Sequence, residues 1–119
     1  MLDLRERTFT FSIDIIDLVE KLPKSKPSDV VCYQIVKSGT SVAANYRAAK
    51  RARSDKEFIS KMNIVLEEAD ETIYWLEIIK AKQWTDIEAI EILIKEANEL
   101  TAIFVSTLKT INNRLKNKT

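Results

Sequence analysis

Residues 87–115, IEAIEILIKEANELTAIFVSTLKTINNRL, decide the fold that the sequence predicts. Apolar and small side chains recur along this stretch at alternating steps of three and four, the spacing that gathers side chains on one face of an α-helix. A 3.5-residue repeat held over this length is typical of helices that pack with nearly parallel axes in a left-handed bundle. The repeat comprises Ile87, Ile90, Ile94, Ala97, Thr101, Phe104, Leu108, Ile111 and Leu115.

A second repeat of the same kind occupies residues 58–79 and predicts another long helix. Ser54 and Glu57 precede it at the spacing of a capping box, in which the serine hydroxyl accepts a hydrogen bond from a free backbone amide of the first turn. Thr85 and Glu88 have the same spacing and are expected to open the last helix. The repeat comprises Phe58, Met62, Val65, Ala69, Thr72, Leu76 and Ile79.

The sequence before residue 23 predicts a shorter helix. Phe11, Ile15, Leu18 and Leu22 lie at steps of four, three and four, so they share one helix face. Pro23 is expected to end this helix, because proline lacks the amide group that a helix interior requires.

The next helix contains a run of small side chains over residues 38–45. Ser28 or Asp29 is expected to cap its first turn through a side-chain oxygen. Gly39 lies within the run, but one interior glycine costs only about 1 kcal/mol of helix stability. We therefore expect a single helix here, with a kink at Gly39 as the alternative.

The composition agrees with a few long helices. The chain has 119 residues, of which 45% are hydrophobic and 31% charged, as in a globular domain. One glycine and two prolines are too few for the many turns of a β-sandwich. We predict an all-α fold, an antiparallel up-down four-helix bundle, forming a single domain over residues 1–119. The helices are expected at about residues 3–22, 28–52, 55–82 and 86–113.

No pattern in the sequence indicates catalysis. The chain has no histidine, the most common general base and a frequent metal ligand. Glu67 and Glu71 are four residues apart and share a helix face, but solvation or salt bridges explain them better than a bound metal. Cys32 lies among apolar residues without an activating partner, so we expect a buried, inert thiol. We expect no enzyme activity, no cofactor and no metal.

Three features suggest a cytoplasmic protein without a membrane partner. A single cysteine excludes an internal disulfide and suits a reducing compartment. The opening residues, MLDLRER, are charged and do not resemble a secretory leader. No stretch approaches the 18 or so uninterrupted apolar residues that cross a bilayer.

The net charge is only +1, but the charges are unevenly distributed. Residues 36–61 carry seven basic and two acidic side chains, whereas residues 62–79 carry five acidic side chains and no basic one. The tail after residue 105 is basic, and its last part, residues 114–119, is expected to be frayed and to serve only solubility. The strongest local cluster, called the basic face below, comprises Arg47, Lys50, Arg51, Arg53 and Lys61.

Two uses of the basic face remain open at this point. It can contact the phosphates of RNA or DNA, which gives salt-sensitive binding that tolerates many sequences. Alternatively, it can form salt bridges with the acidic third helix, within the chain or between subunits, and act in a protein–protein adaptor or scaffold with no nucleic-acid role. Arg51 and Arg53 are also favoured by the helix dipole, because they lie near a helix C-terminus.

The predicted helices carry more apolar surface than one bundle requires. Large side chains lie beside the main repeat on the third helix and on a second face of the fourth. A second apolar face predicts that another subunit covers it, so we expect self-association. These side chains are Ile59, Leu66, Ile73, Tyr74, Trp75, Ile78, Leu93, Leu100 and Ile103.

Residues 38–54, SGTSVAANYRAAKRARS, resemble the bacterial four-helix bundle family of 23S rRNA intervening-sequence proteins. Residues 3–8, 65–77 and 96–100 fit the same pattern, so the resemblance covers nearly the whole chain. Members of the family are similar in being antiparallel bundles that assemble as ring-like homopentamers, and no catalytic residues carry over. A related branch, the accessory variability proteins of diversity-generating retroelements, binds nucleic acid and a reverse transcriptase through a basic surface. This chain's net charge of +1 departs from that strongly basic branch.

The resemblance implies a pentamer. In a pentamer, the small-residue run at residues 38–45, the basic face and the acidic residues of the third helix become candidates for the contacts between subunits. Arg47 is then expected to reach an acidic side chain of the third helix in a neighbouring copy. The candidate interface residues are Ser38, Ser41, Asn45, Arg47, Glu67, Glu68 and Glu71.

Overall fold

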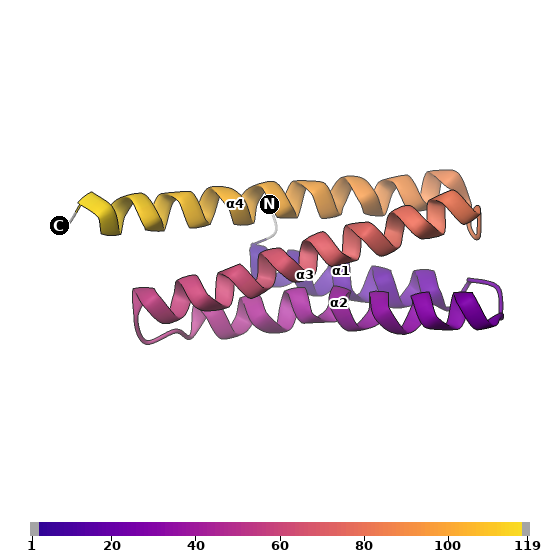
Figure 1. The fold of residues 1–119 in the computed structure, drawn as a ribbon, viewed down its shortest axis with the longest axis horizontal. Helices are drawn as coiled ribbons and strands as arrows, with labels where there is room; N and C mark the ends of the chain where they lie inside the picture. Colours follow the sequence, from indigo (N-terminus) through magenta and orange to yellow (C-terminus); the bar gives the residue numbers. More distant parts are fainter. Residues whose placement is uncertain (1–2, 118–119) are drawn as a thin grey trace.

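The computed structural model describes residues 3–117, which form four α-helices and no strand (Figure 1). The helices are α1 (Leu4–Val19), α2 (Lys26–Lys50), α3 (Asp55–Lys82) and α4 (Ile87–Asn117). The α1–α2 and α3–α4 connections lie at one end of the long axis, and the α2–α3 connection lies at the other (Figure 1). Each helix packs against two neighbours in the order α1, α2, α3, α4 around a shared core. No helix within the described residues is long and apolar enough to cross a membrane.

The repeat in α3 predicts its buried face correctly. Six of its seven members, from Met62 to Ile79, are buried, and Phe58 is half-buried at the edge of the core. The prediction for α1 is confirmed as well, because Phe11, Ile15 and Leu18 of the helix and Leu22 just beyond it are all buried. Both patterns succeed because a strict alternation of three and four residues tracks one side of a helix.

The repeat predicted for α4 is only partly correct in its first half, where Ile90 and Ala97 are buried as expected. Ile87 is 50% exposed and Ile94 is only half-buried, whereas Leu93 and Leu100 are buried and belong to the core. The buried side chains from Ile90 to Phe104 still step by three and four, so the predicted face is displaced by one residue at Ile94 and Thr101. From Phe104 onward the predicted residues Leu108 and Ile111 do lie in the core face.

The helix starts confirm one predicted cap and correct two. The Ser54 side chain accepts from the amide of Glu57, as predicted. The cap of α2 is Ser25 rather than Ser28 or Asp29, and Pro27 fits in the first turn because the amides there have no helical partner to lose. The cap of α4 is Asp86 rather than Thr85, and its carboxylate accepts from the amide of Ala89 at 3.3 Å.

The helix α2 is continuous through Gly39, so the single-helix prediction holds. Gly39 lies against Ile15 of α1, and a β-carbon at this position would come within 3.1 Å of the Ile15 Cγ1 atom. The Ser12 hydroxyl donates to the Gly39 carbonyl at 3.0 Å and to the Thr8 carbonyl at 3.2 Å. The small residue therefore allows α1 to approach α2 closely within one chain.

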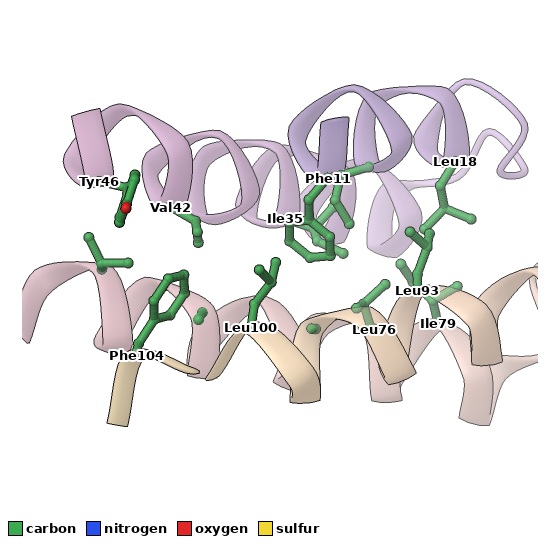
Figure 2. Close-up of a cluster of buried hydrophobic side chains, with 14 of the residues drawn as sticks. Phe11, Leu18, Ile35, Val42, Tyr46, Leu76, Ile79, Leu93, Leu100 and Phe104 are labelled. Carbon is green, nitrogen blue, oxygen red and sulfur yellow. The ribbon is translucent and has the colours of Figure 1, made fainter. Parts of the chain in front are cut away.

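Diagonally opposite helices meet through side chains at the centre of the core. Figure 2 shows Tyr46 and Val42 of α2 directed toward Phe104 and Leu100 of α4. The rings of Tyr46 and Phe104 lie 6.4 Å apart between centroids, in a tilted arrangement. This contact stabilises the bundle beyond the burial of the two rings alone.

The helix α1 is much shorter than the others. Its 16 residues span about 24 Å, whereas the 25, 28 and 31 residues of α2, α3 and α4 span about 38, 42 and 46 Å. In Figure 1, α1 begins near the middle of the long axis, and the other three helices continue past it toward the α2–α3 connection. We call this part of the molecule the open end, because three of the four helices described in residues 3–117 form it.

An ion pair fixes where α1 lies along α4. The Arg7 guanidinium donates to both carboxylate oxygens of Glu96, at 2.8 and 2.7 Å, and to Glu99 at 3.0 Å. The hydrogen bond to Glu96 is the main cause that raises the pKa of Arg7 above its usual range. Because Arg7 belongs to the first turn of α1, residues of α4 beyond Glu99 extend past α1 into the open end.

Candidate nucleic-acid interface

The basic face lies at the open end of the molecule. Arg47 and Lys50 are exposed in the last turn of α2, and Arg51 follows as its C-terminal cap. Arg53 lies in the short connection to α3, and Lys61 is half-buried in the second turn of α3. Two helix ends and one connection therefore bring these five cations to one region.

Most of the basic face has no acidic partner among the described residues. Among residues 3–117, no ion pair involves Arg47, Lys50, Arg51 or Lys61. Arg53 lies 3.8 Å from the Glu57 carboxylate, but its side chain is 91% exposed, so this pair contributes little and leaves Arg53 accessible. The expected pairing of Arg47 with the acidic residues of α3 is thus absent within one chain.

A groove opens beside the basic face at the open end. Its volume is about 830 Å³, and it lies between the end of α2, the start of α3 and the second half of α4. Lys50 and Arg53 line it, so they belong both to the groove and to the basic face. No residue of α1 is among the described residues that line it, so α1 leaves the groove uncovered. The sequence predicts that the first helix is the shortest, but it does not show which side chains of α2, α3 and α4 meet here, because that depends on how the helices pack.

Arg114 belongs to the site, although no sequence pattern predicted it. The tail was expected to be frayed from residue 114, but α4 continues to Asn117, and residues 118–119 lie outside the described residues. Arg114 lines the groove, and its Nη2 atom lies 3.4 Å from the Oδ1 atom of Asp55. The tail therefore adds a third cation to the groove rather than serving only solubility.

The acidic residues of α3 that were expected at a subunit interface lie near the middle of the helix, whereas Asp55 and Glu57 lie in its first turn at the open end. Glu67 and Glu71 are exposed, and Glu68 is half-buried. Burial and the nearby Glu71 raise the pKa of Glu68, while Lys37 acts in the opposite direction. Within the described part of the chain, no group of three or more metal-ligating side chains occurs here or elsewhere.

The small residues expected at a subunit surface differ in their burial. Ser38 is fully buried, and its hydroxyl oxygen lies 2.9 Å from that of Thr72 on α3. Ser38 therefore packs inside the chain, and its expected place in a subunit interface is not supported. Ser41 and Asn45 are half-buried, and the Asn45 amide donates to the Ser41 carbonyl.

Cys32 is half-buried rather than fully buried as expected. Its sulfur lies 3.8 Å from the Ser28 hydroxyl oxygen, and its side chain packs against the edge of the core. The Ser28 hydroxyl and the apolar side chains of the core do not include a base or a cation that would activate the thiol.

Comparisons with known proteins agree with this architecture. The sequence model of a family described as 23S rRNA-intervening sequence protein matches residues 1–106. A crystal structure from Bacteroides thetaiotaomicron, of a protein with unknown function from the S23 ribosomal protein family, is 34% identical in sequence. The match covers 90% of this chain and 99% of that chain, with a TM-score of 0.83. No curated protein matches the chain.

Proposed function

Because this chain belongs to the 23S rRNA-intervening sequence protein family, whose function is unknown, we propose a role from its own surface chemistry. We propose that it is a non-enzymatic, cytoplasmic, homo-oligomeric bundle that binds RNA or DNA through the basic face. The single observation that carries this proposal is the gathering of accessible cations at the open end. Four of the five cations of the basic face have no ion pair within residues 3–117, so their charge is available to phosphates.

Phosphate binding is favoured by the residue types and by their distribution. Arginine presents a planar fork of donors that matches phosphate oxygens, and three of the five residues are arginines. The net charge of the whole chain is only +1, so attraction to nucleic acid must be local and directed by the open end. The groove cation Arg114 extends this positive surface onto α4.

We predict salt-sensitive binding of a short RNA or DNA. Five phosphate contacts release the corresponding counterions, so the logarithm of the association constant should fall with the logarithm of the salt concentration at a slope of about −3.5 to −4.5. Fluorescence anisotropy over a series of potassium chloride concentrations measures this slope. An association constant that does not change with salt, or no binding at low salt, would contradict the proposed function.

We further propose that the antiparallel up-down bundle is the unit of a ring-like homopentamer. The alternate ends at which the connections lie support this order of helices (Figure 1). Support for self-association comes from the large side chains that remain exposed, among them Tyr33 at 66% and Tyr74 at 57%.

The oligomeric state and one interface pair are testable together. Light scattering coupled to size-exclusion chromatography at micromolar concentration should give about five times the 13.7 kDa mass of one chain. If Arg47 pairs with Glu71 of a neighbour, Arg47→Glu and Glu71→Arg should each weaken assembly, and the double variant should partly restore it. A monomeric wild-type protein would rule out the ring, and a double variant worse than either single one would rule out this pair.

The second candidate function is a protein–protein adaptor without a nucleic-acid role. The exposed acidic residues Glu67 and Glu71 favour it, because within residues 3–117 they form no ion pair and can meet the basic face of another subunit. Two results together would favour the adaptor over nucleic-acid binding. The double variant Arg47→Glu with Glu71→Arg would restore assembly, and the wild-type protein would show no salt-dependent binding of RNA or DNA.

A further inference from the structure

We infer that the groove at the open end receives an unpaired nucleotide, so that the protein prefers single-stranded to double-stranded nucleic acid. This inference rests on the proposed function and assigns a second part of the site to it. The basic face attracts the backbone of any nucleic acid, whereas only a strand with free bases can place a base in the groove.

The size and position of the groove suit this ligand. Its volume of about 830 Å³ lies within the range of about 300–1,000 Å³ that is usual for small-molecule sites. Lys50 and Arg53 stand on its border with the basic face, so a strand whose phosphates contact them runs past the opening. Arg114 lines the wall formed by α4 and provides a cation on the side away from α2.

The side chains that line the groove match a nucleotide in both polarity and shape. Phe58 is half-buried and offers an aromatic ring, and Ile103 and Ile111 add apolar surface on α4. The hydroxyl groups of Ser106 and Thr110 are exposed and form no hydrogen bond within residues 3–117, so they are available to a polar ligand. A nucleic-acid base has an apolar face, which can stack on the ring of Phe58. It also has a polar edge, which can form hydrogen bonds with the hydroxyl groups of Ser106 and Thr110.

The charges of the groove also favour an anionic ligand. Lys50, Arg53 and Arg114 outnumber Asp55, which is the single acidic residue in the lining. Asp55 faces Arg114 at 3.4 Å, and both side chains are about half exposed, so the pair is weak and leaves the arginine able to contact a phosphate as well.

A duplex cannot use the groove in the same way. Its bases are paired and stacked, and exposing one of them costs the energy of unpairing and unstacking. A duplex is therefore expected to bind through its phosphates alone, with the basic face as its contact. A single strand gains the additional stacking on Phe58, which is tolerant of sequence because every base has a π-face.

The test compares a labelled single-stranded RNA of about 12 nucleotides with a duplex of the same length, within the size that one binding module covers. With the wild-type protein, the single strand should bind about tenfold more tightly than the duplex. Phe58→Leu keeps apolar volume at the edge of the core but removes the aromatic ring. It should reduce single-strand affinity to the level of the duplex and leave duplex affinity unchanged.

Phe58→Trp is the matched variant that keeps an aromatic ring, and it should retain the preference for single strands. A purely structural role of Phe58 would instead make both variants weaken single strand and duplex alike, which would overturn the inference. Equal wild-type affinity for the two RNAs would overturn it as well while leaving the proposed function intact. Binding of neither RNA at low salt would overturn the proposed function and this inference together.

Discussion

Replacing Gly39 with leucine is expected to lower the free energy of unfolding by about 2–3 kcal/mol. A β-carbon alone would lie 3.1 to 3.4 Å from three atoms of the fully buried Ile15, so a longer side chain must push α1 away from α2. That displacement also breaks the 3.0 Å hydrogen bond from the Ser12 hydroxyl to the Gly39 carbonyl. The gain of about 1 kcal/mol from better helix propensity offsets only part of this cost.

Guanidinium denaturation at a fixed protein concentration measures this effect and keeps any oligomerisation constant. Ala44→Leu is the matched control, because Ala44 lies five residues further along the same helix and is exposed. It should change the free energy of unfolding by no more than about 0.5 kcal/mol. Gly39→Ala should lie between the two, since a slight shift of Ile15 accommodates one methyl group. A Gly39→Leu variant as stable as the wild type would show that α1 does not depend on this close approach.

Removing four cations of the basic face together should weaken nucleic-acid binding by about 100-fold or more at low salt. The variant carries Arg47→Gln, Lys50→Gln, Arg51→Gln and Arg53→Gln, all at exposed positions. Each lost phosphate contact also reduces the steepness of the salt dependence, so the slope should become shallower by about 3. Stability should change little, because the four side chains form one weak ion pair within residues 3–117.

The matched control removes the same charge elsewhere on the molecule. Lys21, Lys24, Lys82 and Lys95 are exposed, and replacing all four with glutamine also lowers the net charge of +1 by four. Affinity and slope should then stay within about threefold of the wild type, since general attraction depends weakly on distant charges. Equal losses in the two quadruple variants would show that net charge, and not the basic face, governs binding.

The number of helices and the buried face of α3 were predictable from sequence for a physical reason. A helix buries side chains that recur every three or four residues, and this pattern is set by the residues of the helix itself. The Ser54 cap was predictable on the same ground, because its side chain bonds an amide only three residues away. The resemblance at residues 38–54 likewise identified the family correctly.

Other local features needed the neighbouring helices. Leu93 and Leu100 of α4 are buried although their neighbours Ile94 and Thr101 belong to the predicted repeat, because packing against both α1 and α3 decides which face turns inward. Ser38 looked like a residue for contacts between subunits, but Thr72 of α3 meets it within the chain. Such outcomes depend on contacts between residues far apart in sequence, which no local pattern contains.

The sequence by itself determined that this chain forms four helices, that its charges fall into basic and acidic segments, and that it has no histidine. These properties follow from composition and from spacing over a few residues. Only the tertiary structure decided that Arg114 of α4 joins Lys50 and Arg53, and that a groove lies between them. The physical reason is that a groove is formed by helices of unequal length meeting side by side, which is a property of their packing.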